Sequence, residues 1–319
     1  MNKLVNFNKA KSFLQTDQSN KLLLLSVILI WGYAWVTMKM SLEYTGPFTF
    51  SAFRFLIGAL TLLLILFWKR VPRPKKKLWG PLILLGIFQT TLVYIFVMTG
   101  MRFVDAGKSS VILYSMPLWS AILASKFLNE KVSWIRGVGV GLGVVGLSFV
   151  IGIDVWKNQN MMVLMGEGFI VLAAVIWAAA NIYHKKVFAG ENQLTVTTYQ
   201  MLFGMVGLFL AALLMERNEP IIVNVTSISL LLFTGILASA FCFSVWFYLL
   251  EKLDTNTLTN ASLLVPIAGI VASYFSLQEP VTLEMFFGAM LILIGIMVNK
   301  NDQLIYKKLK LKTGHNENI

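Results

Sequence analysis

Apolar stretches of membrane-spanning length follow one another along almost the whole chain, with short polar segments between them. A run of about 20 apolar residues crosses a bilayer as a helix. The breaks carry turn or charge signals, such as Gly46-Pro47, the basic block Val71–Lys77 and Glu279-Pro280. The pattern predicts an all-α integral membrane protein with ten transmembrane helices, at 22–40, 48–68, 79–99, 105–127, 134–153, 165–185, 195–215, 228–250, 256–277 and 281–299.

One segment plan occurs twice in the chain. Asp105–Glu130 and Asp254–Glu279 each start with an aspartate, carry a proline 12 positions later (Pro117 or Pro266) and end on a glutamate 13 positions after that proline. The offset of 149 continues in four further identical pairs, which are Val132 and Val281, Gly139 and Gly288, Leu142 and Leu291, and Gly146 and Gly295. The chain therefore looks like one unit written twice.

The two copies divide the chain into a tail at 1–21, a five-helix repeat at 22–153, a second five-helix repeat at 165–299 and a basic tail at 300–319. Because each half has an odd number of spans, the second copy starts from the opposite side of the membrane, and the repeat is inverted. Inverted repeats are common in transporters, whose substrate site lies near the midplane between the halves. Chance similarity between apolar helices is the alternative, and the matched prolines and acids argue against it.

Lys and Arg residues gather on one side of the predicted membrane. The side that holds both tails and the even-to-odd connections carries 21 of the 27, the other side carries five, and Arg54 remains within the second span. Cytoplasmic connections carry such an excess, so both termini of this multi-pass protein of the cytoplasmic membrane are expected in the cytoplasm. The net charge of +12 is thus a topology signal, and no nucleic-acid partner is expected.

Composition narrows the classes further. The chain is 57% hydrophobic and 13% charged, whereas soluble domains carry about 25% charged residues. The single cysteine, Cys242, excludes a disulfide framework and a Cys/His metal cluster, so no cofactor is expected. The expected partners are the lipid bilayer and a small-molecule substrate, and the sequence sets no oligomeric state.

Two features predict a cavity near the middle of the membrane. Pro117 and Pro266 lie near the centres of spans four and nine, where each frees a carbonyl four residues earlier and permits helix bending. Freed carbonyls are tolerated inside protein or beside a wet cavity, and a packing kink is the alternative. Aromatic and polar residues at similar depth are expected to line a substrate cavity: Trp31, Trp35, Gln89, Tyr94, Ser110, Tyr114, Ser115, Trp177, Asn181, Ser239, Phe243, Trp246, Asn260 and Ser262.

Each of these residues taken singly could instead hold two helices together. The set favours a cavity, because it combines aromatic walls with a few neutral hydrogen-bonding groups. Trp31 and Trp177 are related at an offset of 146. The glycine-rich run Gly137–Gly146 lies within a span, so it indicates close helix packing and not a dinucleotide site.

Charged residues within the spans are few. No Asp or Glu lies in the central third of any span, which disfavours a proton-coupled mechanism built on a midplane carboxylate. Acids near span ends, such as Asp105 and Glu279, suit helix N-termini. Arg54 lies deep in the second span, and an ion partner or carbonyl contacts inside the protein would explain it. This structural role is favoured over ligand binding.

The motifs, taken together, resemble the drug/metabolite transporter superfamily of the EamA type. Trp31–Lys39 is similar to its first helix and Arg54-Phe55 to its second, while the repeat cores match Asp105–Glu130 and the segment from Trp246 to Pro280. The resemblance covers about residues 22–299. It implies ten helices in two inverted five-helix repeats. It also implies a central cavity from helices one, three, four, six, eight and nine, and export of amino acids, metabolites or toxic compounds by alternating access.

The resulting hypothesis is a secondary transporter that exports small neutral or zwitterionic metabolites such as amino acids. A multidrug efflux pump is the main alternative, because aromatic walls can hold a cation. A membrane-embedded enzyme would need acids, histidines or a nucleophile clustered at one depth, and a channel would need a ring of filter groups. The sequence contains neither pattern, so no enzymatic activity is expected.

Overall fold

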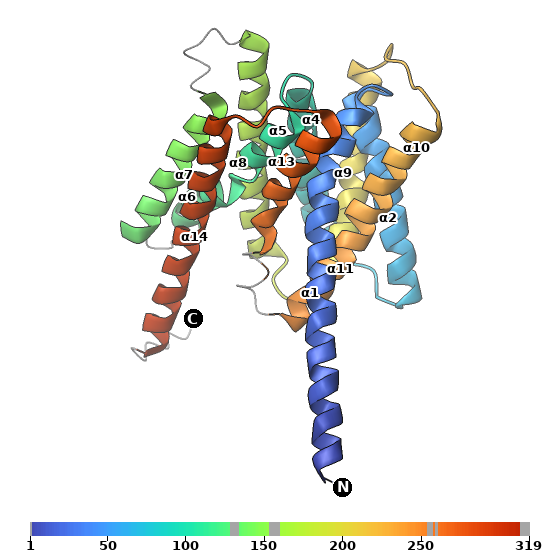
Figure 1. Cartoon of the computed structure of the whole chain (residues 1–319). Coiled ribbons are helices and arrows are strands. Elements are labelled where there is room, and N and C mark those ends of the chain that lie inside the picture. Colours follow the sequence, from blue (N-terminus) through green and yellow to red (C-terminus); the bar gives the residue numbers. More distant parts are fainter. Residues whose placement is uncertain (1, 128–133, 153–159, 254–257, 259–260, 313–319) are drawn as a thin grey trace.

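The computed structural model describes residues 2–127, 134–152, 160–253, 258 and 261–312 (Figure 1). Every regular element in these residues is a helix. The first repeat holds α1 (Asn2–Ser41), α2 (Pro47–Trp68), η1 (Lys76–Leu78), α3 (Trp79–Gly86), η2 (Ile87–Leu92), α4 (Val93–Met101), α5 (Ala106–Leu113), α6 (Met116–Phe127) and α7 (Trp134–Gly152). The second holds α8 (Met161–Val187), α9 (Gln193–Met215), α10 (Val225–Leu232), η4 (Phe233–Phe241), α11 (Cys242–Lys252), α13 (Leu264–Leu277) and α14 (Leu283–Lys312).

These helices form the ten spans expected from the sequence, which confirms the predicted fold class. Six helical segments of the described chain are long and apolar enough to cross a membrane, at 18–41, 47–68, 76–101, 161–187, 193–215 and 225–252. Shorter apolar helices at 137–151, 264–277 and 283–298 belong to three of the remaining spans, and α5 and α6 together form the span at 105–127. The helices also run further than the spans, because α1 begins at Asn2 and α14 continues to Lys312.

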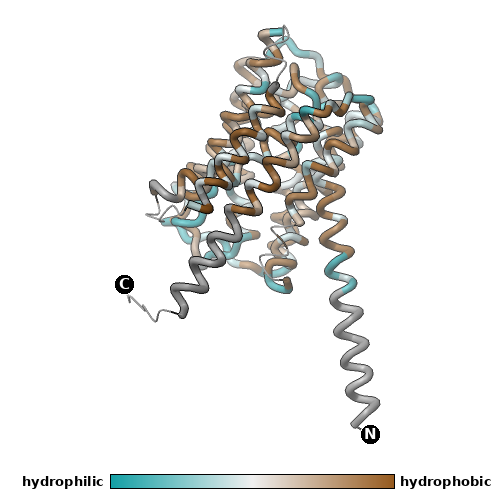
Figure 2. The backbone as a smooth tube through the Cα atoms, turned by 60° about the vertical axis from the view of Figure 1, so that its left-hand side comes forward, coloured by the Kyte–Doolittle hydropathy of each residue, from teal (hydrophilic) through white to brown (hydrophobic). Residues whose placement is uncertain are grey.

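The lateral surface of the bundle is apolar. Figure 2 shows hydrophobic residues through the body of the helices and hydrophilic ones mainly toward their ends. Large apolar side chains such as Trp68 and Leu214 are 80% and 83% exposed, and exposed apolar surface of this extent marks contact with lipid. Helices suit this environment, because a helix satisfies most of its backbone hydrogen bonds within the segment.

The bundle has two distinct ends. The start of α1 and the end of α14 lie at the same one, which we call the termini end (Figure 1). At the opposite end, the carboxylates of Glu216 and Glu279 accept hydrogen bonds from backbone N–H groups in the first turns of α2 and α5. We call this the capped end.

Glycine contacts show that the two repeats pack with approximate two-fold symmetry. A Cβ on Gly146 would lie 2.6 Å from the carbonyl oxygen of Gly288, and one on Gly295 would lie 2.5 Å from that of Gly139. These four glycines form two repeat pairs at the offset of 149, so each contact between α7 and α14 is the image of the other. The close packing expected of the glycine-rich run is confirmed at Gly139 and Gly146.

The spans that border the interior are interrupted at matched places. The π-helical segments η2 and η4 lie in the third and eighth spans, and Gly86 and Gly235, related by 149, lie next to or inside them. In the fourth span, a turn at Tyr114-Ser115 separates α5 from α6, so Pro117 falls in the first turn of α6. Pro266 likewise falls in the first turn of α13, after a turn at Leu263. Both prolines therefore follow a break in their span.

Candidate functional site

Two adjoining cavities lie inside the bundle and share one wall. The narrow compartment has a volume of about 130 Å³ and the wide compartment about 350 Å³. Both are lined by Trp31, Leu113, Tyr114, Trp177 and Phe243. The narrow compartment is completed by Ala34, Trp35, Met38, Arg54, Tyr94, Val97 and Ala238. The wide compartment is completed by Gln89, Met116, Asn181, His184, Val196, Thr197, Gln200, Trp246, Phe247 and Ser262.

The compartments lie toward opposite ends of the bundle. Met38 and Arg54 lie on the halves of α1 and α2 nearer the capped end, and both line the narrow compartment. His184 and Val196 lie near the termini end of α8 and α9, and both line the wide compartment. The shared wall therefore separates a small space near the capped end from a larger one near the termini end.

The compartments are images of each other under the repeat. Residues of the first two spans match the second copy at an offset of 146, and residues of spans three and four match it at 149. The shared Trp31 corresponds to the shared Trp177. In the other lining pairs the first residue lines the narrow compartment and the second lines the wide one: Trp35 and Asn181, Met38 and His184, Arg54 and Gln200, Tyr94 and Phe243, Val97 and Trp246, Ala238 and Gln89, and Leu113 and Ser262. Of these residues, Phe243 and Leu113 also line the other compartment.

Trp31 forms the centre of the shared wall. Its indole Nε1 donates a 2.9 Å hydrogen bond to the carbonyl oxygen of Ala238 on η4. Its ring centroid lies 5.6 Å from that of Phe243 and 5.4 Å from that of Trp246. These contacts hold α1 of the first repeat against η4 and α11 of the second. Movement of one repeat against the other would therefore change the partition between the compartments.

Arg54 is the charged residue of the narrow compartment, and it is only 5% exposed. Its guanidinium carbon lies 5.0 Å from the ring centroid of Tyr94 and 5.1 Å from that of Phe55. Nη1 lies 2.8 Å from the sulfur of Met38, and Nε has no hydrogen-bond partner. Within the described chain, neither the ion partner nor the carbonyl contacts expected for a structural role are present.

The structure brings most of the expected cavity residues together. Ten of the fourteen line one or both compartments: Trp31, Trp35, Gln89, Tyr94, Tyr114, Trp177, Asn181, Phe243, Trp246 and Ser262. Asn260 lies outside the described residues. Arg54 and Gln200 also line the compartments, although neither is among the lining residues expected from the sequence, and they share the offset of 146 that relates Trp31 to Trp177.

Three of the expected residues do not line either compartment. Ser110, Ser115 and Ser239 are fully buried. Their hydroxyl groups donate to carbonyl oxygens of their own helical segments, at 2.7 Å to Gly107, 2.7 Å to Ile112 and 2.8 Å to Thr234. A serine hydroxyl that donates in this way to its preceding turn has no donor left for a cavity.

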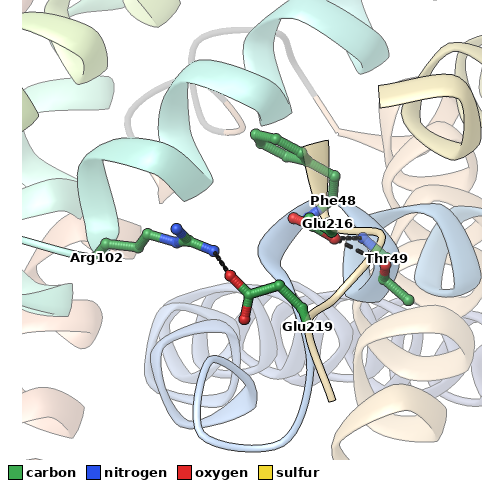
Figure 3. A network of polar contacts seen from close by, with 5 residues as sticks. All are labelled: Phe48, Thr49, Arg102, Glu216 and Glu219. Carbon is green, nitrogen blue, oxygen red and sulfur yellow. Dashed lines mark hydrogen bonds and ion pairs between the residues drawn. The ribbon is translucent and has the colours of Figure 1, made fainter. Parts of the chain in front are cut away.

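Two glutamates of the second repeat close the capped end onto the first repeat. Glu216 accepts from the N–H of Phe48 at 2.7 Å, the N–H of Thr49 at 2.8 Å and the hydroxyl of Thr49 at 2.7 Å (Figure 3). Glu219 accepts from Arg102 at 3.0 Å in the same loop. Carboxylates are favourable at the positive ends of helix dipoles, so the contacts of Glu216 fasten α2 to the connection after α9, and Glu219 fastens the end of α4 to the same connection.

A second set of contacts between the two repeats lies at the start of α5. Glu279 accepts from the N–H groups of Ala106 and Gly107 at 2.9 and 3.1 Å. Asp105 occupies the N-cap position that suits an aspartate, yet its side chain makes no capping hydrogen bond. Burial, and then the neighbouring carboxylate of Glu279, raise the pKa of Asp105 in the connection before α5, while Lys39 and Lys108 oppose that shift.

Comparison with known proteins agrees with this architecture. The EamA-like transporter family matches residues 19–152 and 164–300. An uncharacterized transporter of Bacillus subtilis (YoaV) is 32% identical over 86% of this chain and 94% of its own length. A probable amino-acid metabolite efflux pump of Escherichia coli is 24% identical over 89% of this chain and 95% of its own.

A solved crystal structure shares the fold with a TM-score of 0.62, at 17% sequence identity, over 92% of this chain and 99% of that one. At this identity the likeness speaks for the fold alone. The match to the family covers both repeats and nearly every described span. The chain belongs to the EamA-like transporter family, a family of membrane transporters and not of enzymes.

Proposed function

We propose that the protein is a secondary transporter that exports small zwitterionic or neutral metabolites, such as amino acids, across the cytoplasmic membrane. The observation that carries this proposal is the pair of symmetry-related compartments with a shared aromatic wall. Alternating access requires a site that can open to either side through two arrangements of similar energy. An inverted repeat provides two such arrangements, because exchanging the conformations of the halves exchanges the roles of the compartments.

The described arrangement corresponds to a state closed at the capped end. Glu216 and Glu279 join the repeats there, and the larger of the two interior compartments lies toward the termini end. With both termini in the cytoplasm, as the distribution of Lys and Arg favours, this state faces inward. Substrate would enter the wide compartment from the cytoplasm and leave by way of the narrow compartment after the capped end opens.

The nature of the substrate is supported by the walls and by the relatives. Tryptophan, tyrosine and phenylalanine rings suit an apolar body, and Asn181, Gln200 and Ser262 offer neutral hydrogen-bonding groups. Relatives in Escherichia coli and Salmonella typhimurium carry the name of probable amino-acid metabolite efflux pumps. Of the described residues that line either compartment, none is Asp or Glu. This weighs against the second candidate, a pump for cationic drugs, because such cations would meet Arg54 without a carboxylate.

The test is flux of each of the radiolabelled protein amino acids from vesicles that contain the purified protein. Trp31→Ala and Trp177→Ala should each lower the flux of a transported amino acid by about tenfold or more, since each removes a stacking surface of the shared wall. Trp134→Ala is the matched control, because Trp134 is 84% exposed on the outside of the bundle. Flux at the wild-type level in both wall variants would show that the compartments are not the path.

Efflux of a cationic dye such as ethidium from the same vesicles tests the second candidate function, a pump for cationic drugs. Saturable ethidium efflux without amino-acid flux would replace the proposed substrate class with cationic drugs. Slow, saturable turnover would also separate a transporter from a channel, which passes substrate at much higher rates.

A further inference from the structure

The narrow compartment differs from the wide one at a single charged position. Arg54 lies four residues before Gly58, and Gln200 lies four residues before Gly204, at the same offset of 146. A Cβ on Gly58 would meet Ser239 and one on Gly204 would meet Thr90, which are themselves related by 149. The two sites are therefore equivalent in backbone packing, and the difference between them lies in the side chains.

The hydrogen bonds of the two side chains are not equivalent. Gln200 accepts a 2.8 Å hydrogen bond from the hydroxyl of Thr90. At the matching place next to Arg54, the hydroxyl of Ser239 donates back to the carbonyl of Thr234 instead. Gln200 thus has a protein partner, whereas Arg54 faces the cavity without the corresponding one.

The guanidinium of Arg54 has unused donor capacity in a buried place. An arginine side chain carries five N–H donors, and the contact of Nη1 is to a thioether sulfur, which is a weak acceptor. Nε has no partner. The rings of Tyr94 and Phe55 stabilise the positive charge through their faces, but they accept none of these hydrogen bonds in the ordinary sense. A buried charge without an ion partner is costly, and charged residues at such depth in a membrane protein are usually functional.

An anion in the narrow compartment would complete this site. The planar fork of a guanidinium matches a carboxylate with two parallel hydrogen bonds. The remaining wall is apolar and aromatic, with Trp35, Val97 and Leu113 as examples, so the carboxylate should belong to a molecule with an apolar or aromatic body. We infer that Arg54 binds the carboxylate of the transported substrate in the narrow compartment, which deepens the proposed function and rests on it.

This assignment gives the two compartments different roles. In the wide compartment, the substrate meets neutral groups such as Asn181 and Gln200. In the narrow compartment, its carboxylate meets a fixed positive charge. The charge of Arg54 attracts the carboxylate of the substrate toward the capped end of the bundle. The apolar part of the substrate then contacts the shared wall of Trp31 and Trp177.

The experiment compares three probes that share a phenyl ring: phenylacetate, its neutral amide phenylacetamide, and the cation phenethylamine. Binding to the full-length protein in detergent is followed by the quenching of tryptophan fluorescence, since Trp31, Trp35 and Trp177 line the compartments. The wild type should bind phenylacetate about tenfold or more tightly than phenylacetamide, and phenethylamine least. Equal affinity for the acid and the amide, or no binding of phenylacetate up to about 10 mM, would overturn the assignment.

The variants identify the source of this preference. Arg54→Gln copies the residue of the second repeat and should abolish the preference for the acid, whereas Arg54→Lys should retain part of it because the charge remains. Arg102→Gln is the matched control, since it removes one positive charge from an exposed pair at the capped end. Equal loss in Arg54→Gln and Arg102→Gln would assign the effect to general electrostatics and overturn the inference.

Three further outcomes are informative. If Arg54→Gln does not insert into the membrane, the wild-type preference and the Arg54→Lys variant still decide the matter. If the acid preference depends on Arg54 but no amino acid is transported, the proposed substrate class fails while the carboxylate site stands. If amino acids are transported equally by the wild type and Arg54→Gln, the carboxylate site fails while the proposed function stands.

Discussion

The carboxylate of Glu279 binds the N–H of Ala106 across the boundary between the two repeats. Glu279 lies in the connection after α13, and Ala106 is the first residue of α5. The helix start that Asp105 precedes is therefore satisfied by an acid from the other half of the protein. In the proposed alternating-access cycle this bond would break when the halves separate at the capped end, so it would contribute to the free-energy difference between the two states.

Replacement of this acid should open the capped end. Glu279→Gln keeps the size of the side chain but removes the charge from the start of α5, and the loss of such a cap costs about 1 kcal/mol. We expect the population that is open at the capped end to rise about fivefold. The measurement is the labelling rate of Ser110→Cys, a buried position between α5 and α13, in a Cys242→Ser background with a membrane-impermeant maleimide.

Glu219→Gln serves as the control for this experiment. Glu219 pairs with Arg102 at the same end, but both side chains are about two-fifths exposed, at 43% and 41%. Exposed ion pairs contribute about 0–1 kcal/mol, so the labelling rate should change little. An unchanged rate in Glu279→Gln would mean that the contact with Ala106 does not restrain the opening.

Glu216 is expected to affect stability more strongly than Glu279. It is 7% exposed and accepts three hydrogen bonds at the start of α2. Glu216→Gln leaves at least one of these buried donors unsatisfied, at a cost of about 1–3 kcal/mol. For domains of 150–250 residues each kcal/mol lowers Tm by about 2–4 °C, so thermal unfolding in detergent should occur several degrees lower.

A graded variant checks that interpretation. Thr49→Val removes only the hydroxyl bond to Glu216 and leaves both backbone bonds in place. Its Tm should lie between those of the wild type and Glu216→Gln. A larger decrease in Thr49→Val than in Glu216→Gln would locate the stability in the packing of the threonine side chain and not in the capping of α2.

The sequence predicts the ten spans, the inverted repeat and much of the aromatic wall, because each leaves a pattern in the order of residues. Apolar runs mark the spans, and a fixed offset marks the repeat, including the glycines through which α7 packs on α14. Trp31 and Trp177 stand at matched depth in matched spans, so their meeting in one wall follows from the repeat.

The partners of individual polar groups could not be predicted in the same way. Ser239 and Thr90 occupy matched positions. The hydroxyl of Ser239 donates a hydrogen bond within its own helical segment, whereas that of Thr90 donates to the side chain of Gln200. A hydroxyl in a helix always has a nearby carbonyl as an alternative acceptor, so its direction depends on which neighbour approaches. Glu279 is a similar case, since its bond to α5 exists only because the two halves meet at the capped end.

Protonation of Asp105 should favour the closed capped end. Burial and the carboxylate of Glu279 raise its pKa above the ordinary 3.8, while Lys39 and Lys108, the latter paired with Glu167, oppose the shift. A raised pKa means that the folded, closed arrangement binds the proton more tightly than a solvated one. The resulting stabilisation is full below the ordinary value and is lost as pH rises through the raised value.

Labelling of Ser110→Cys at several pH values measures this effect. After correction for the pH dependence of the thiol reaction, the rate should be lower at about pH 4, near the ordinary pKa, than at about pH 7. Asp105→Asn cannot ionise, so the corrected rate should be the same at both values. A pH dependence that persists in Asp105→Asn would show that Asp105 is not the group responsible.

For the glycines between α7 and α14, we expect the effect of an alanine substitution on Tm to depend on whether the glycine lies at the helix contact. Gly146→Ala would place a Cβ 2.6 Å from the carbonyl oxygen of Gly288, whereas a Cβ on Gly137 would meet nothing within 4 Å. Overpacking costs about 1–3 kcal/mol, so Gly146→Ala should lower Tm. Gly137→Ala should leave Tm unchanged or raise it, since alanine favours a helix over glycine by about 1 kcal/mol.

The two-fold relation extends this prediction to the second repeat. Gly295→Ala would place a Cβ 2.5 Å from the carbonyl oxygen of Gly139, the image of the contact at Gly146. Thermal unfolding of the two single variants should therefore show similar decreases in Tm. If Gly146→Ala destabilises the protein and Gly295→Ala does not, the two contacts differ in energy although they match in geometry. Equal values for Gly146→Ala and Gly137→Ala would instead mean that α7 and α14 do not depend on this close approach.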